Sequence, residues 1–153
     1  MKSRVNPYTA APNAMKALMS VETYIEKSRL EAQLVDLIKT RVSQINGCAY
    51  CLHMHAKEAL QRGESDKRLF LLDAWRESNL YAPRERAALA WAESLTRIAE
   101  THAPDDFYED VRQHFSDKEL ADLSVAITMI NAWNRIAIGS RLQHPADRVR
   151  AAA

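Results

Sequence analysis

Hydrophobic residues recur along this chain at intervals of three and four positions, the spacing that places side chains on one face of an α-helix. The segment from about Leu30 to Ile45 is the clearest case. At about 100° per residue, its apolar side chains fall on one side: Leu34, Leu37, Ile38, Val42 and Ile45. The chain also has only three glycines and five prolines, which favours helices over a turn-rich β fold. We therefore expect an all-α protein.

Residues that cap or break helices set the boundaries of six to seven segments. Gly47 and Gly63 each end a segment, Pro83 begins another, and Ser116 with Glu119 forms a capping box before the longest one. The expected helices run approximately over Ala14 to Lys27, Leu30 to Ile45, Cys48 to Arg62, Asp66 to Glu77, Pro83 to Ala99, a short stretch from Pro104, and Ser116 to Leu142. Pro145 ends the helical region, and we expect the last few residues to Ala153 to be frayed.

Length and composition favour a single globular domain and argue against a nucleic-acid-binding, membrane-spanning or secreted protein. We interpret residues 1–153 as a single domain with enough mass to bury a core. The net charge is +1 and acids are interleaved with bases, so neither nucleic acid nor an anionic membrane is an expected partner. No run approaches the roughly 20 apolar residues of a membrane span. The start, Met1 to Pro7, lacks the apolar run of a secretory signal, so we expect a cytoplasmic protein.

The only two cysteines, Cys48 and Cys51, are separated by two residues. In a reducing cytosol such a pair is more often catalytic, redox-active or metal-binding than a permanent cross-link. If a helix begins at or just before Cys48, Cys51 lies about 60° to one side and His55 falls between them on the inward face. His53 points away from this group, and we expect it to face solvent.

This arrangement suits thiol chemistry. The thiolate is the reactive form, and a free thiol with a pKa of about 8.5 is mostly protonated at neutral pH. The first turn of a helix directs unsatisfied N–H groups and a positive dipole at Cys48 and Cys51, and a nearby imidazole such as His55 can accept the proton. A carboxylate is often needed to orient that imidazole.

Two other interpretations of the pair stay open. Two buried cysteines near a helix start can have no function at all. A structural zinc site would need four ligands, of which Cys48, Cys51 and His55 supply three, and the chain contains no second Cys-x-x-Cys. The remaining histidines, His102, His114 and His144, follow no pattern and receive no role.

The segment Ser43-Gln44-Ile45-Asn46-Gly47-Cys48-Ala49-Tyr50-Cys51, followed by His55, resembles the signature of the alkyl hydroperoxidase D-like (AhpD-like) proteins of the carboxymuconolactone decarboxylase superfamily. The resemblance extends to Glu85–Glu93, which looks like the middle helix of that family. It also includes Phe115–Leu120 and Asn131–Arg135, which look like its last long helix. It covers most of the chain, about 30–142, which we take as the redox core.

The resemblance implies an all-helical fold, homo-oligomers that are commonly trimers or hexamers, and peroxide reduction through a redox-active Cys48–Cys51 disulfide. In that scheme Cys51 attacks the peroxide and becomes a sulfenic acid, and Cys48 resolves it to the disulfide. His55 helps to deprotonate the attacking thiol. No bound cofactor is implied; a lipoyl-bearing or other dithiol protein is the expected reductant.

Two positions depart from the family pattern. The family relay begins with a glutamate at the position of Asp36, whose side chain is one methylene shorter, and a histidine stands where this chain has Tyr50. Hydropathy alone would place Asp36 on a solvated face with Thr40 and Ser43, so both interpretations of Asp36 stay open. For Asn131, Asn134 and Arg135, polar residues in an apolar helix, we expect a structural role between helices or subunits.

The hypothesis is a thiol-dependent antioxidant oxidoreductase of the peroxidase type, with Cys51 as nucleophile, Cys48 as resolving thiol, His55 as general base and Asp36 as orienting carboxylate. The alternatives are a protein disulfide reductase, a non-enzymatic redox-sensing oligomer and, less favoured, a lactone decarboxylase. The chain has no glycine-rich dinucleotide fingerprint, so we do not expect electrons to come from a bound nicotinamide or flavin.

Overall fold

The computed structural model describes residues 2–146 of the chain, and the predicted fraying toward Ala153 lies outside this range. Within it the fold is all-α, as expected, with nine α-helices and one 3-10 helix. The helices are α1 (Pro7–Ala10), α2 (Pro12–Glu26), α3 (Ala32–Asn46), α4 (Ala49–Gln61), α5 (Asp66–Leu71), the 3-10 helix η1 (Leu72–Glu77), α6 (Pro83–Thr96), α7 (Ile98–Thr101), α8 (Asp105–Arg112) and α9 (Asp117–Ser140).

The expected count of six to seven helices is too low. The additional elements are short: α1 and α7 have four residues each, and the segment expected over Asp66 to Glu77 changes from α-helix to 3-10 helix at Leu72. A single turn such as α1 depends on local capping, because the Asn6 side chain accepts a hydrogen bond from the Tyr8 backbone N–H. Such a turn is too short to show hydrophobic periodicity.

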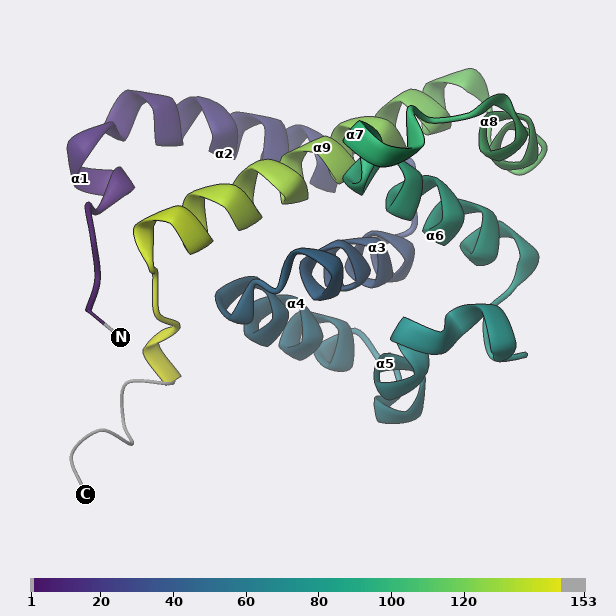
Figure 1. Ribbon diagram of the computed structural model, residues 1–153, viewed down its shortest axis with the longest axis horizontal. Coiled ribbons are helices and arrows are strands. Elements are labelled where there is room, and N and C mark those ends of the chain that lie inside the picture. The colour runs from purple at the N-terminus through teal and green to yellow at the C-terminus, as the bar shows by residue number, and fades with distance from the viewer. Residues whose placement is uncertain (1, 147–153) are drawn as a thin grey trace.

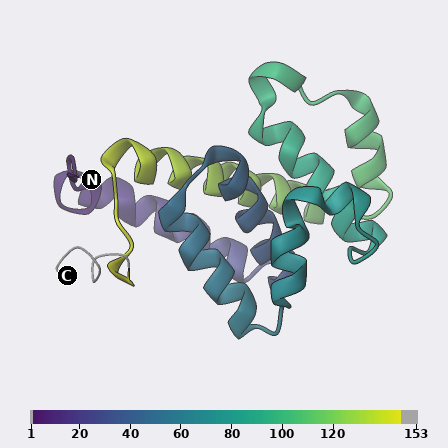
Figure 2. The same ribbon diagram turned by 60° about the horizontal axis from the view of Figure 1, so that its bottom comes forward.

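Helix α3 forms the centre of the structure (Figure 1) and packs against α4, α6 and α9. Figure 2 shows α2 running alongside α9, and these two helices are also in contact. Nine residues of α3 are buried, and they cover almost its whole circumference: Leu34, Asp36, Leu37, Ile38, Lys39, Thr40, Arg41, Val42 and Ser43. The hydropathy-based interpretation of a solvated face at Asp36, Thr40 and Ser43 is therefore wrong, because neighbouring helices cover that side too.

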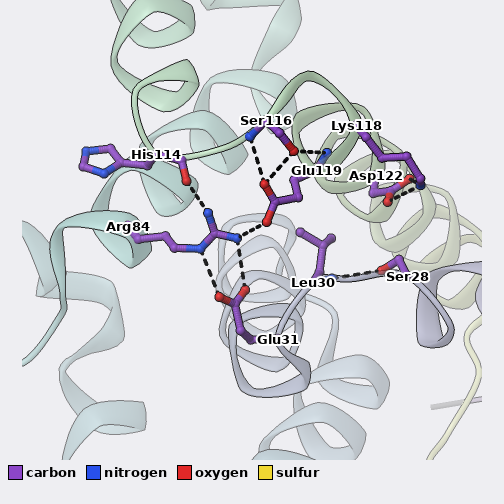
Figure 3. Close-up of polar contacts among 9 residues, drawn as sticks. All are labelled: Ser28, Leu30, Glu31, Arg84, His114, Ser116, Lys118, Glu119 and Asp122. Carbon is purple, nitrogen blue, oxygen red and sulfur yellow. Dashed lines mark hydrogen bonds and ion pairs between the residues drawn. The ribbon is translucent and has the colours of Figure 1, made fainter.

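The start of α9 is fixed by the predicted capping box and by an arginine from α6 (Figure 3). The Ser116 hydroxyl accepts a hydrogen bond from the Glu119 N–H, and the Glu119 carboxylate accepts one from the Ser116 N–H at 2.9 Å. The Arg84 guanidinium donates to Glu119 at 2.8 Å and to Glu31, just before α3, at 3.1 Å. One side chain thus connects the first turns of α3, α6 and α9.

A buried ion cluster joins α3 to α6. The Glu93 carboxylate accepts hydrogen bonds from Arg41 Nε at 2.7 Å and from Trp75 Nε1 at 2.9 Å, and it also pairs with Arg76. Burial opposes ionisation of Glu93, but these three donors hold the pKa of its carboxyl below the ordinary value. The second carboxylate on Arg41, that of Asp73, is 79% exposed.

We predict that Glu93→Gln lowers the free energy of unfolding by about 3 kcal/mol, because it leaves the Arg41 charge buried with a weaker partner. Asp73→Asn is the matched control on the same guanidinium, and its exposed carboxylate should contribute less than about 1 kcal/mol. Urea unfolding of both variants measures the difference. Equal losses in the two variants would contradict the importance assigned to the buried pair.

Among the described residues, no helix combines the length and the apolar character needed to cross a bilayer.

Candidate active site

The turn between α3 and α4 places Cys48 at a helix start. Gly47 has φ 67° and ψ 34°, the left-handed conformation that ends α3, as its position predicted. Cys48 is the N-cap of α4, so the helix begins one residue after it. The Cys48 backbone N–H donates to the Ser43 carbonyl oxygen at 3.0 Å, which anchors this turn to the end of α3.

The two thiols are in direct contact. They are free and buried, with their Sγ atoms 2.7 Å apart, and the Cys51 backbone N–H donates to Cys48 Sγ at 3.4 Å. The Cys51 thiol hydrogen bond lowers the pKa of Cys48 to about 7, aided by the backbone N–H and opposed by burial. Donating that hydrogen bond, together with burial, raises the pKa of Cys51. Cys48 is therefore the sulfur of the pair that ionises more readily.

His55 lies on the same face of α4 as Cys51, one turn further on, and is buried as the helical spacing predicted. Its Nδ1 is 3.0 Å from the Glu58 carboxylate, and this hydrogen bond lowers the pKa of Glu58. An ionised carboxylate at Nδ1 keeps the proton on that nitrogen. Nε2 is then the nitrogen free to accept a proton.

Asp36 is buried beside the site, but its partner is an arginine. Both of its carboxylate oxygens accept hydrogen bonds from Arg62 Nη1, at 2.7 and 2.8 Å. Desolvation raises the pKa of Asp36, and Arg62 partly offsets this. Asp36 lines the same cleft as Cys51 and His55, whereas the carboxylate that contacts the imidazole is Glu58.

A cleft of about 660 Å³ gives access to the site from between α2, α3, α4 and α9. Of the two cysteines it is Cys51 that lines the cleft, together with His55, Glu58 and Asp36. Its walls also carry apolar side chains: Met19, Ile25, Val35, Met54, Trp133 and Ile136. Tyr50, which stands where the family pattern has a histidine, lines the cleft as well. A small molecule with an apolar body could therefore reach Cys51.

Sequence reasoning missed two residues of the site, Glu58 and Arg62. Glu58 could have been found from its position three residues after His55 on one helix. Arg62 gave no local signal, because its role depends on Asp36, which comes from another helix. Asn134, for which a structural role between helices was expected, does connect α9 to α3 through Ser43 and Asn46. His53 was expected to face solvent; it is instead half-buried and stacks on His144, with ring centroids 3.8 Å apart.

Across residues 2–146, no three His, Cys, Asp or Glu side chains converge to hold a metal ion.

Comparison with known proteins decides the family. The carboxymuconolactone decarboxylase family profile matches residues 11–94. The chain belongs to this family. Uncharacterized protein YdfG of Bacillus subtilis (strain 168) is 43% identical over 138 residues, which is 90% of this chain and 94% of YdfG.

Solved structures identify the branch of this family as AhpD-like. The protein of unknown function ATU0492 from Agrobacterium tumefaciens, which has been proposed to be an antioxidant defence protein AhpD, is 51% identical with a TM-score of 0.91. The match covers 94% of this chain and 99% of ATU0492. An uncharacterized peroxidase-related protein from Silicibacter sp. TM1040 is 26% identical with a TM-score of 0.80, over 92% of this chain and 74% of that protein.

We predict that the ultraviolet absorbance of the thiolate in the reduced protein rises with pH around a midpoint of about 7, since the pKa of Cys48 is lowered to about 7. An ordinary thiol would give a midpoint of about 8.5. Because the folded pKa is lowered, the thiolate also stabilises the fold above the ordinary thiol pKa, and this contribution is lost as the pH falls through about 7. A midpoint at the ordinary value would contradict the lowered pKa assigned to Cys48.

Proposed function

We propose that this AhpD-like protein is a thiol peroxidase that reduces organic hydroperoxides through a Cys48–Cys51 disulfide. The observation that carries the proposal is the hydrogen-bonded thiol pair, one sulfur of which lines an apolar-walled cleft beside a histidine. The names of the relatives agree with it, since ATU0492 has been proposed as an antioxidant protein and the Silicibacter protein is peroxidase-related.

The sulfur that a peroxide can reach and the sulfur that ionises more readily belong to different cysteines. Cys51 lines the cleft, so a peroxide meets Cys51 first, whereas negative charge is more stable on Cys48. Transfer of the Cys51 proton to Cys48 over the 2.7 Å contact produces the thiolate at the accessible sulfur. His55 accepts the proton that the pair as a whole has lost. We therefore keep Cys51 as nucleophile and Cys48 as resolving thiol, and assign Cys48 the additional role of accepting the Cys51 proton.

The reaction then balances in two steps. The Cys51 sulfur attacks the terminal peroxide oxygen, the O–O bond breaks, and the alkoxide takes the proton held by His55 and leaves as an alcohol, giving a sulfenic acid on Cys51. The Cys48 sulfur then attacks the Cys51 sulfur; the hydroxide leaves as water with the proton that Cys48 had accepted, and the disulfide forms. The two thiols supply both electrons.

Return to the dithiol requires two electrons from outside the chain. We propose a lipoyl-bearing or other dithiol protein as donor, and a homo-oligomer, trimeric or hexameric, as the working form. No bound cofactor takes part in this scheme. Disulfide exchange with a partner protein, or redox sensing through a change in assembly, would use the same thiol pair without consuming peroxide.

The carboxylate that orients His55 is, in this proposal, Glu58 rather than Asp36. Glu58 contacts Nδ1 directly, while both oxygens of Asp36 are occupied by Arg62. Asp36 remains part of the site as a buried charge whose pairing with Arg62 positions the end of α4.

We predict that Cys51→Ser abolishes peroxide consumption with a dihydrolipoyl donor, because it removes the sulfur that the peroxide reaches. Cys48→Ser should still react once and then stop as a sulfenic acid, which a dimedone probe followed by mass spectrometry detects. Wild-type turnover by Cys51→Ser would contradict the assignment. A wild-type protein that forms and reduces its disulfide without consuming peroxide would favour disulfide exchange or sensing.

We predict that Glu58→Gln slows turnover by at least about tenfold, because a neutral amide neither fixes the imidazole tautomer nor stabilises its protonated form. Asp36→Asn should chiefly lower the unfolding temperature and change turnover less. Steady-state rates and thermal unfolding of the two variants, measured side by side, test the distinction. The reverse order of effects on turnover would return the orienting role to Asp36.

A further inference from the structure

The cleft that Cys51 lines carries charged side chains as well as apolar ones. Among the described residues, four of its lining side chains are carboxylates and two are cations, so negative charges are in excess by two. The carboxylates are Glu22, Glu26, Asp36 and Glu58, and the cations are Lys39 and Arg62. This local excess contrasts with the whole chain, whose formal net charge is +1.

Four of these charges form two ion pairs. Lys39 Nζ lies 2.6 Å from one oxygen of Glu22, and the Arg62 guanidinium donates to both oxygens of Asp36. The other oxygen of Glu22 accepts a hydrogen bond from Trp133 Nε1 at 2.7 Å. Each cation of the cleft is therefore already paired with a carboxylate, and neither is left to attract an anionic ligand.

The excess negative charge belongs to Glu26 and Glu58. Glu26 is exposed at the end of α2 and makes no hydrogen bond or ion pair with the described residues. The Glu58 side chain is 40% exposed, and its carboxylate contacts the imidazole of His55, which cancels its charge only when it is protonated. A cleft with apolar walls concentrates such a field, so a ligand that approaches Cys51 meets a negative potential.

We propose that the cleft selects its ligands by charge, admitting neutral or cationic molecules with an apolar body and disfavouring anionic ones. The identity of these ligands, a hydroperoxide and a dithiol, rests on the proposed function. Neutral alkyl hydroperoxides are then better substrates than hydroperoxides that carry a carboxylate. Similarly, a dithiol whose acyl group is held in an amide linkage is a better electron donor than the same dithiol with a free carboxylate.

The first test compares iodoacetamide with iodoacetate, which differ by one negative charge, on the full-length reduced protein near neutral pH. Peptide mass spectrometry follows alkylation of Cys51. The same thiolate reacts with both reagents, so the ratio of their rates does not depend on the pKa of the thiol. Compared with a small free thiol, Cys51 should disfavour iodoacetate by a further factor of about five at low salt. In about 1 M NaCl, where the Debye length is about 3 Å, this factor should fall below about two.

Glu26→Gln and Glu100→Gln form a matched pair of variants. Each removes one exposed carboxylate, but Glu26 lines the cleft, whereas Glu100 of α7 does not. Glu26→Gln should raise the iodoacetate rate by about twofold and leave the iodoacetamide rate unchanged, because only the charged reagent senses the field. Glu100→Gln should change neither rate.

The second test follows reduction of the disulfide form by dihydrolipoamide and by dihydrolipoate, which carry the same dithiol and differ in one charge. The amide should react at least about three times faster at low salt. Equal rates for the two dithiols would overturn the proposal. So would a ratio of iodoacetate to iodoacetamide rates equal to that of a free thiol, or equal effects of the two glutamine variants. If the charge preference is found but the wild type consumes no peroxide, the peroxidase proposal fails and the charge selectivity of the cleft stands.

Discussion

The structure depends on the burial of helix α3 on nearly all sides. A helix in this position has to find a partner for every polar side chain it carries, because an unpaired buried charge is costly. The partners come from four different helices or their caps: Asp36 pairs with Arg62 at the end of α4, Lys39 with Glu22 of α2, Arg41 with Glu93 of α6, and Ser43 with Asn134 of α9. The same requirement that fixes the packing around α3 therefore also places the side chains of the cleft. The Thr40 hydroxyl is an exception and has no hydrogen-bond partner among the described residues.

The division of roles that we propose for the two cysteines follows from the backbone conformation of Gly47. Gly47 ends α3 in the left-handed conformation, so the next helix starts only after Cys48. Cys48 consequently receives the N–H groups of a helix start, whereas Cys51, within the first turn, faces the cleft. The sulfur with the lower pKa, that of Cys48, and the sulfur that lines the cleft, that of Cys51, are thus two different atoms in direct contact.

Much of this arrangement could be predicted from the sequence. The long helices, the Gly47 break, the capping box of α9 and the inward face shared by Cys51 and His55 all follow from local spacing and from residue types with strong backbone preferences. The single-turn helices could not be predicted in this way, and neither could the partners of buried charges. Asp36 illustrates the limit: its neighbours along α3 indicate a polar face, and only the packing of other helices shows that this face is covered. Arg62, the partner of Asp36, could be recognised only once the helices had been brought together in space.

For the proposed redox cycle, the burial of both cysteines has a consequence for how electrons would enter. Cys48 is 1% exposed and Cys51 is 2% exposed. A reductase whose reactive cysteine does not protrude from its surface therefore cannot bring that cysteine into contact with either sulfur. Thiol–disulfide exchange needs the attacking sulfur to reach its target directly. The approach through the cleft admits something slender, such as a dithiol at the end of a long flexible arm. If the proposed disulfide cycle operates, the fold would select its electron donors by size and would keep the disulfide out of equilibrium with bulky protein thiols.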